Sequence, residues 1–227
     1  TEVANTNTVR AGLGAAGASS ASGIFFGGYD PAGTNRSPLV ESWDNSSWTE
    51  VGDLNTGRNG TSGCGIQAAA LCAGGFVSDV VANVETWNGT SWTEVGDLNT
   101  ARHNLASFGL STAAIATGGA GPGATTESWD NSSWTEVGDL NTARVNIDGG
   151  GIQTAGLVFG GNPPGTPSLL GVTESWDGSA WTEVADLATS RYDHGGTGTS
   201  TLGLCVGGTA PAITGATEEW AFAASIQ

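Results

Sequence analysis

The chain has no lysine and no methionine, and charged residues make up only 12% of its 227 positions. Six arginines face 22 acidic residues, so the formal net charge is −16 at pH 7. Such a charge repels the phosphates of nucleic acids and of anionic lipids, and we expect no nucleic-acid partner. No apolar run approaches the roughly 20 residues that cross a bilayer, so membrane insertion is not expected either.

Cysteine and histidine are scarce as well. The three cysteines (Cys64, Cys72 and Cys205) contain no CxxC pair and lack the Cys/His spacing of a metal site. Two of them occupy a repeat position that other copies fill with apolar or small residues, which indicates buried thiols acting as small hydrophobic side chains. We therefore expect no metal and no cofactor.

Glycine and tryptophan are abundant instead, with 38 and 9 residues, the profile of many short strands joined by tight turns. A segment of the type SWTEVGDLNTAR recurs and ends each time in an arginine. These arginines are Arg10, Arg58, Arg102, Arg144 and Arg191. A glycine pair follows each arginine by 16 or 17 residues, the first pair being Gly27-Gly28. A Glu-x-Trp triplet such as Glu85-Thr86-Trp87 comes next, which makes five copies of one unit.

Arginine, a glycine pair, and then two aromatic residues about five positions apart resemble the Kelch repeat over essentially the whole chain. The units depart from Kelch repeats in placing tryptophan where tyrosine is usual, and in number, since six or seven copies are commoner than five. The resemblance implies an all-β, five-bladed β-propeller with four antiparallel strands in each blade.

The pattern of one unit predicts its four strands. In the second unit these are Thr61 to Gln67, Ala69 to Ala73, Val81 to Trp87 and Ser91 to Val95. The last two strands are joined by Asn88-Gly89, which suits a tight hairpin turn. Such a turn places both tryptophans of a unit on one face of the hairpin, where we expect them to stack between neighbouring blades. These residues are Trp43, Trp48, Trp87, Trp92, Trp129, Trp134, Trp176, Trp181 and Trp220.

The chain ends predict how the ring closes. The last unit has three strands, and residues 1–3 form a fourth strand with no blade before it. Pairing Thr1 to Val3 with the strand Glu218 to Phe222 completes the fifth blade, because open blades leave apolar faces exposed. Residues 1–227 then form a single domain. Its blades are 11–51, 59–95, 103–137, 145–184, and 192–222 completed by 1–3.

A residue that recurs in every unit is expected to belong to the scaffold. On this argument the five repeated arginines satisfy backbone carbonyls and acids near the central channel, and repeated acids such as Glu50 and Asp53 are structural. The alternative is that the arginines form a positive ring that binds an anion in the channel.

The residues that differ between units point to a binding surface. They lie in the loops between the second and third strands of each blade and directly after each arginine, and both connections emerge on the same side of a four-stranded meander. Loops on a rigid scaffold commonly carry recognition, so this loop face is the predicted ligand-binding site. The other interpretation is that the loop sequences differ because nothing constrains them. The candidates are Tyr29, Asp30, Arg36, Phe76, Asp79, His103, Pro122, Asn162, Tyr192 and His194.

The inventory of residues argues against catalysis. Some Kelch propellers resemble galactose oxidase, but the two tyrosines and two histidines available here do not supply its copper site. Five-bladed propellers also include glycosidases with paired carboxylates, for which Asp148 and Asp193 are the nearest candidates. Nothing else in the sequence supports that pair, and we expect no enzyme activity.

The sequences of the repeats, with SWTEVGDLNTAR, GATEEW and a closing FGG, resemble those of repeat-rich Kelch-type proteins of marine bacteriophages. That resemblance implies an extracellular or virion protein, such as a tail fibre or surface decoration, whose partner is a host-surface glycan or protein or another virion protein. Two alternatives stay open. One is a structural protein that assembles with itself into a homo-oligomer within a particle, and the other is a Kelch-type protein-interaction scaffold.

Overall fold

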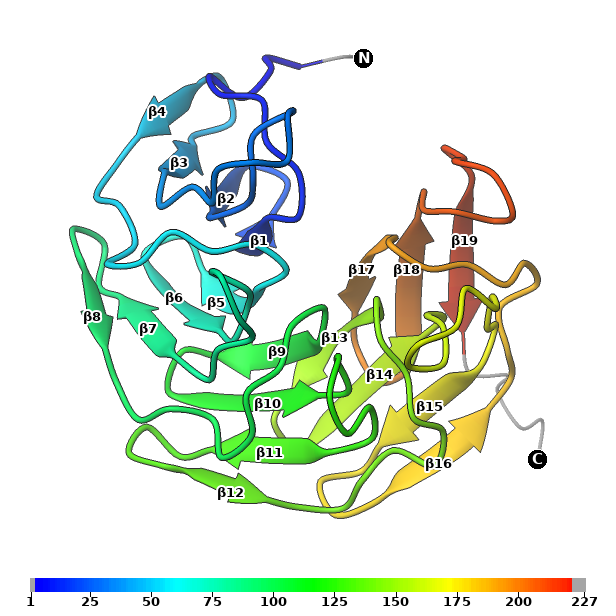
Figure 1. The fold of residues 1–227 in the computed structure, drawn as a ribbon. Helices are drawn as coiled ribbons and strands as arrows, with labels where there is room; N and C mark the ends of the chain where they lie inside the picture. Colours follow the sequence, from blue (N-terminus) through cyan, green and yellow to red (C-terminus); the bar gives the residue numbers. More distant parts are fainter. Residues whose placement is uncertain (1–2, 222–227) are drawn as a thin grey trace. The chain divides into compact units, whose positions relative to one another are not determined.

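The computed structural model describes residues 3–221, and all the regular structure in this range consists of short β-strands (Figure 1). The strands form five antiparallel sheets, each with its strands in chain order. The chain is an all-β, five-bladed β-propeller, so the predicted fold class is confirmed. No helix able to cross a membrane occurs among residues 3–221.

Four of the sheets have four strands and the fifth has three within the described residues. The first contains β1 (Gly14–Ser19), β2 (Ser22–Phe26), β3 (Val40–Trp43) and β4 (Trp48–Glu50). The second contains β5 (Ser62–Ile66), β6 (Ala69–Ala73), β7 (Val84–Trp87) and β8 (Trp92–Glu94). The third contains β9 (Ala106–Leu110), β10 (Ala113–Thr117), β11 (Thr126–Trp129) and β12 (Trp134–Glu136). The fourth contains β13 (Asp148–Ile152), β14 (Ala155–Phe159), β15 (Thr173–Trp176) and β16 (Trp181–Val184). The fifth contains β17 (Gly195–Gly198), β18 (Leu202–Val206) and β19 (Thr217–Ala221).

The predicted closure of the ring depends on residues outside this range. Thr1 and Glu2, two of the three residues of the predicted closing strand, and Phe222, the end of its partner strand, lie outside the described residues. Val3 belongs to no strand. The pairing of the two termini and the single domain therefore stay predictions.

The chain forms two compact units, one holding the first two sheets and the other the last two, with the strands of the third sheet divided between them. Each unit has its own apolar core. In the first unit, residues from both sheets pack together: Ala16, Ile24, Phe26, Val40, Leu54, Ala70, Cys72, Trp87 and Trp92. In the second unit, the larger buried cluster is Ala106, Phe108, Ile115, Leu140, Ile147, Val158, Trp176 and Trp181.

The strands of the second sheet match their predicted positions closely, except that β7 begins at Val84 and not at Val81. Two of the three preceding residues bond elsewhere. The Val81 amide donates to the carbonyl of Gly75 at 2.9 Å, and the carbonyl of Ala82 accepts from Leu98 at 3.0 Å. Their backbone groups are therefore used to fix the loop and cannot extend the ladder with β6.

The two tryptophans of a hairpin lie opposite each other, as the short turn predicts. Trp87 pairs with Trp92 across β7 and β8, and their ring centroids are 5.5 Å apart. Trp92 also meets the edge of Phe26 from the preceding sheet, at 5.0 Å between centroids. The second tryptophan of this hairpin thus packs between neighbouring blades, which agrees with the expected stacking.

Glycine makes room for that phenylalanine. A Cβ atom placed on Gly63 of β5 would lie 2.3 Å from Cζ of Phe26, which belongs to the neighbouring sheet. Phe108 in the second unit uses the same arrangement, because a Cβ on Gly156 would lie 2.4 Å from its Cε2. Close packing of interiors leaves no space for an added methyl group at these positions.

Candidate functional site

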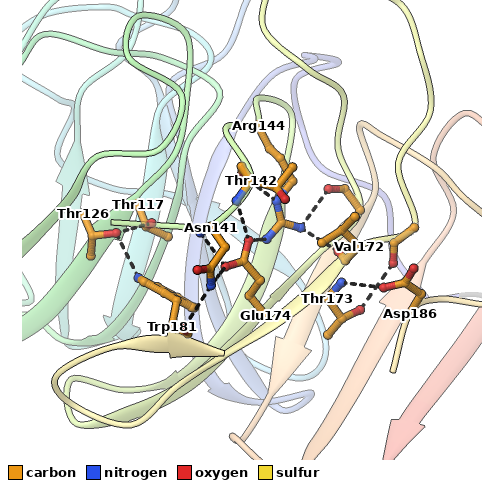
Figure 2. Close-up of polar contacts among 12 residues, drawn as sticks. Thr117, Thr126, Asn141, Thr142, Arg144, Val172, Thr173, Glu174, Trp181 and Asp186 are labelled. Atoms are coloured by element: carbon orange, nitrogen blue, oxygen red, sulfur yellow. Dashed lines mark hydrogen bonds and ion pairs between the residues drawn. The ribbon is translucent and has the colours of Figure 1, made fainter. Parts of the chain in front are cut away.

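A buried ion pair between an arginine and a glutamate holds the loops of the fourth blade, and Figure 2 shows this pair. Nη2 of Arg144 lies 2.8 Å from Oε1 of Glu174, and both side chains are 0% exposed. The same guanidinium group donates from Nη1 to the carbonyl of Val172 at 2.6 Å. Oε2 of Glu174 accepts from the backbone and the side-chain amide of Asn141, each at 2.8 Å. The carboxylate is therefore held by several donors at once.

The network around this pair ties the hairpin strands to the preceding segment. The Asn141 side chain also donates to the carbonyl of Trp181 at 2.9 Å, and the Trp181 indole donates to Oγ1 of Thr126 at 3.1 Å. Figure 2 shows both contacts, which lead from the ion pair towards the third sheet. Buried polar groups need such partners, because an unpaired one loses its hydration without compensation.

The same arrangement recurs in three other blades. Arginine pairs with the glutamate of Glu-x-Trp and donates to carbonyls at the base of the loop: Arg10 with Glu41, Arg58 with Glu85, and Arg191 with Glu218. Arg102 and Glu127 occupy the matching positions of the third blade and are fully buried. Each of the four ion-paired guanidinium groups has its charge balanced by a carboxylate within its own blade.

The repeat predicts that each arginine contacts acidic groups, but it does not identify which ones. Glu50 and Asp53 were expected to be repeated structural acids, whereas the partner is the glutamate two residues before the end of the third strand, as in Glu41. Glu50 and Asp53 are exposed. The signal was available, because a glutamate precedes the tryptophan by two residues in every unit.

Each glycine pair turns the chain so that two variable segments meet at one end of the sheet. Gly27 and Gly28 both have positive φ, 70° and 96°, which glycine adopts without steric cost. The residue after the pair then forms a backbone bridge with the residue after the arginine. Bridges of this kind join Ala11 to Tyr29, Asn59 to Phe76, Val145 to Asn162, and Tyr192 to Thr209. In these four blades, both predicted connections emerge at the same end of the sheet.

Three of the predicted site residues come together in the first unit. The guanidinium carbon of Arg36 lies over the Phe76 ring, 5.3 Å from its centroid. The His103 ring lies 5.8 Å from the same centroid. Asn59 is the bridge partner of Phe76, and directly opposite residues of an antiparallel pair project to the same side. We call Arg36, Asn59, Phe76 and His103 the Phe76 cluster.

The other predicted residues of the first unit serve their own loops. The Asp30 carboxylate accepts hydrogen bonds from the Thr34 amide at 2.8 Å and from the Asn35 side chain at 2.7 Å. These bonds lower the pKa of Asp30 to about 2. Asp79 is exposed and accepts from the Val80 amide at 2.8 Å. Tyr29 is half-buried and contributes to the bridge with Arg36.

The predicted residues of the second unit are not brought into a comparable cluster. Asn162 is only 7% exposed, and its amide group binds the Asn146 side chain at 2.8 Å and the Thr166 carbonyl at 2.6 Å. His194 is also 7% exposed, and its ring lies 5.5 Å from that of Phe159. Pro122 is exposed and Tyr192 half-buried. Asn162 and His194 are thus covered by their own surroundings.

Two titratable groups of the second unit have strongly shifted pKa values. Desolvation, together with the charge of Arg191, lowers the pKa of His194 to about 4. The Phe159 backbone lies close to the ring, yet neither ring nitrogen makes a well-formed hydrogen bond within residues 3–221. Asp148 is partly covered, and desolvation raises its pKa to about 6, although its oxygens accept from the amides of Gly149 and Gly196.

These shifts predict opposite effects of pH on stability. Asp148 binds its proton more tightly when folded, so its contribution is full below about pH 4 and is lost as the pH rises through 6. His194 binds its proton less tightly when folded, so its contribution is full above about pH 6.5 and is lost as the pH falls towards 4. Between pH 7 and 4.5 each amounts to about 2 kcal/mol, and the two nearly cancel.

Single variants should separate the two effects. On acidification from pH 7 to 4.5, His194→Phe is expected to gain about 2 kcal/mol of unfolding free energy relative to the unsubstituted protein. Asp148→Asn is expected to lose a similar amount. Urea unfolding at both pH values measures the differences, and parallel pH profiles for all three proteins would contradict the assignment.

Residues 3–221 contain no group of three or more His, Cys, Asp and Glu side chains placed to hold a metal ion. Comparison of the chain with known protein-family models and with curated proteins found no match.

Proposed function

We propose that the chain is a non-catalytic binding module of an extracellular or virion particle, and that the loop ends of its blades contact a host-surface glycan or protein. One observation carries this proposal: the positions that vary between near-identical blades gather at the loop end of each sheet. The repeated arginines of the four arginine–glutamate ion pairs, by contrast, have side chains that are no more than 2% exposed. A fixed scaffold with variable loops is the arrangement that recognition proteins commonly use.

The contrast between scaffold and loops is clear in the first two blades. Arg10 and Arg58 sit in equivalent networks, and their ion pairs have N–O distances of 2.8 and 2.9 Å. The loops that these networks hold are different. Residues 29–39 form a loop that is held by hydrogen bonds to the Asp30 carboxylate, whereas residues 76–83 form a shorter loop that begins with Phe76. The ion pairs that hold the two loops are equivalent, whereas the loops themselves differ. This contrast supports the proposal that the loops differ because of what they contact.

The non-catalytic part of the proposal is supported by the environment of the candidate acids. Both oxygens of Asp148 accept hydrogen bonds from backbone amides, one in β13 and one in β17. The carboxylate therefore links the two strands and has a structural role. Asp193 has a positive φ of 52° and stands at a turn. The resemblance of the repeats to Kelch-type proteins of marine bacteriophages supports the placement on a particle and the choice of a host-surface partner.

A glycan array and intact host cells test the proposal with a loop variant. The variant carries alanine at four loop positions: Tyr29, Phe76, Pro122 and Tyr192. We expect the unsubstituted protein to bind, and the variant to lose at least about tenfold in affinity, because aromatic side chains dominate binding energy at interfaces.

The matched control carries alanine at four exposed apolar positions, at strand ends beside the turns between the first two strands of the blades: Ile66, Leu110, Ile152 and Leu202. These turns lie at the opposite end of the sheets from the loops, and the control should bind as the unsubstituted protein does. Loss of binding in the control alone would place recognition at the opposite end of the sheets and contradict the proposal. Absence of binding to every glycan and to host cells would overturn the proposed function.

A further inference from the structure

Arg36 differs from the arginines that are paired with glutamate. It is the one arginine outside the repeat, and no carboxylate lies within ion-pairing distance of it among residues 3–221. Asp30 of the same loop binds Thr34 and Asn35 instead. A half-buried guanidinium group without a counter-charge is unfavourable. Other arginines of this chain are paired with a carboxylate, and Arg36 is not, within the part of the chain that the structure describes.

The unused edge of Arg36 has a defined geometry. Its Nη1 donates to the carbonyl of Gly33 at 3.0 Å, and its face lies over Phe76. Nε has no hydrogen-bond partner within the described chain. The unpartnered edge therefore consists of a buried Nε and of Nη2, and two parallel N–H groups of this kind match the two oxygens of a carboxylate.

Two further polar atoms of the Phe76 cluster have no partner among residues 3–221. They are Oδ1 of Asn59 and Nδ1 of His103. Asn59 Oδ1 can only accept a hydrogen bond. Burial lowers the pKa of His103, so its ring is neutral at pH 7 and offers one donor and one acceptor nitrogen. Around Phe76, the cluster thus combines a charged fork with groups that suit hydroxyls.

We infer that the Phe76 cluster is a subsite for a carboxylate-bearing sugar, with Arg36 binding the carboxylate and Asn59 and His103 binding neighbouring hydroxyls. The inference rests on the proposed function and names the ligand class of its loop end. Arg36 Nε, Asn59 Oδ1 and His103 Nδ1 are shielded from solvent, so this binding requires the side chains that cover them to rotate.

A sugar acid fits this set better than an acidic peptide does. Hydroxyls on adjacent ring carbons both donate and accept, so they satisfy the Asn59 oxygen and a neutral histidine beside the carboxylate. The peptide backbone offers only one donor and one acceptor for each residue, spaced about 3.3 Å along an extended chain. The net charge of −16 also repels a polyanionic peptide more strongly than a sugar that carries single, spaced charges.

Binding to trigalacturonate, to its methyl ester and to an octaglutamate peptide tests the inference by isothermal titration calorimetry. Sialyllactose and a glucuronate trisaccharide extend the panel. We expect at least one acidic sugar to bind at least tenfold more tightly than its methyl ester. Arg36→Ala should reduce that affinity at least tenfold, and Arg36→Lys should reduce it less, because lysine keeps the charge without the fork.

The matched control is Ser20→Asp, which changes the net charge by the same −1 as Arg36→Ala. Ser20 is an exposed turn residue at the opposite end of the first sheet, and this variant should bind normally. Circular dichroism and thermal unfolding check that each variant is folded.

Several outcomes would overturn the inference. They are equal binding of acid and ester, unchanged binding by Arg36→Ala, tighter binding of octaglutamate than of every acidic sugar, and no binding of any acidic sugar. Neutral glycans bound on the array, with loss in the quadruple loop variant, would keep the proposed function while rejecting the carboxylate subsite. Failure of every glycan and of host cells would reject both.

Discussion

Replacing Arg144 with methionine is expected to lower the free energy of unfolding by about 3–5 kcal/mol, because the change leaves the Glu174 carboxylate buried without its counter-charge. Both side chains are 0% exposed in this pair. The carbonyl of Val172 loses one of its two donors at the same time and keeps the Gly160 amide. Urea unfolding followed by tryptophan fluorescence measures the change, since Trp181 belongs to the same network.

Two comparisons make this first prediction specific. Arg36→Met removes an arginine that has no carboxylate partner within the described chain, and it should change stability by less than about 1 kcal/mol. Glu218→Gln should cost less than Glu174→Gln, because the Glu218 side chain is 18% exposed and water can replace part of its contacts. Equal losses at Arg144 and Arg36 would contradict a special role for the repeated arginines.

Adding a single methyl group at Gly63 is expected to destabilise the first unit by about 3 kcal/mol, at the upper end of the usual cost of overpacking. The new Cβ would lie 2.3 Å from Cζ of Phe26 and 2.4 Å from the carbonyl oxygen of Ala15. A ring can move, but the backbone of β1 is held by its pairing with β2. Thermal and urea unfolding of Gly63→Ala measure the loss.

Gly156 and Gly215 are the controls for this second prediction. The three atoms nearest to a Cβ on Gly156 all belong to the Phe108 ring, so a smaller side chain in Phe108→Leu should restore part of the stability lost in Gly156→Ala. The same rescue with Phe26→Leu should fail for Gly63→Ala, since the Ala15 carbonyl remains. Gly215 has open space around it, and Gly215→Ala should be neutral or slightly stabilising. Full rescue at Gly63 would show that the backbone contact is unimportant.

Much of the fold was predictable because the repeat shows which residues are equivalent. Five copies of one pattern indicated five sheets, and hairpin turn residues such as Asn88-Gly89 placed the strand ends well. The alternation of side chains in a short hairpin placed Trp87 opposite Trp92. The start of β7 was predicted too early, because the sequence does not show that residues 81 and 82 bond to a loop instead of a strand.

The candidate site was predictable only as a region. Variation between copies selected Arg36, Phe76 and His103, but it also selected Asn162 and His194, which the structure buries. Asn59, which belongs to the cluster, directly follows Arg58 but was not among the candidate residues. A residue's position in a loop does not reveal whether its side chain turns outward, because that depends on neighbours from other blades.

The sequence by itself determined the repeat, the number of sheets, the strand order within each and the end of the sheet where variable residues lie, because these follow from local periodicity and turn chemistry. Only the tertiary structure decided which glutamate meets each arginine, which glycines leave room for a neighbouring phenylalanine, and that Arg36 faces Phe76 without a carboxylate. Those contacts join residues tens of positions apart, and their geometry comes from how strands and sheets pack.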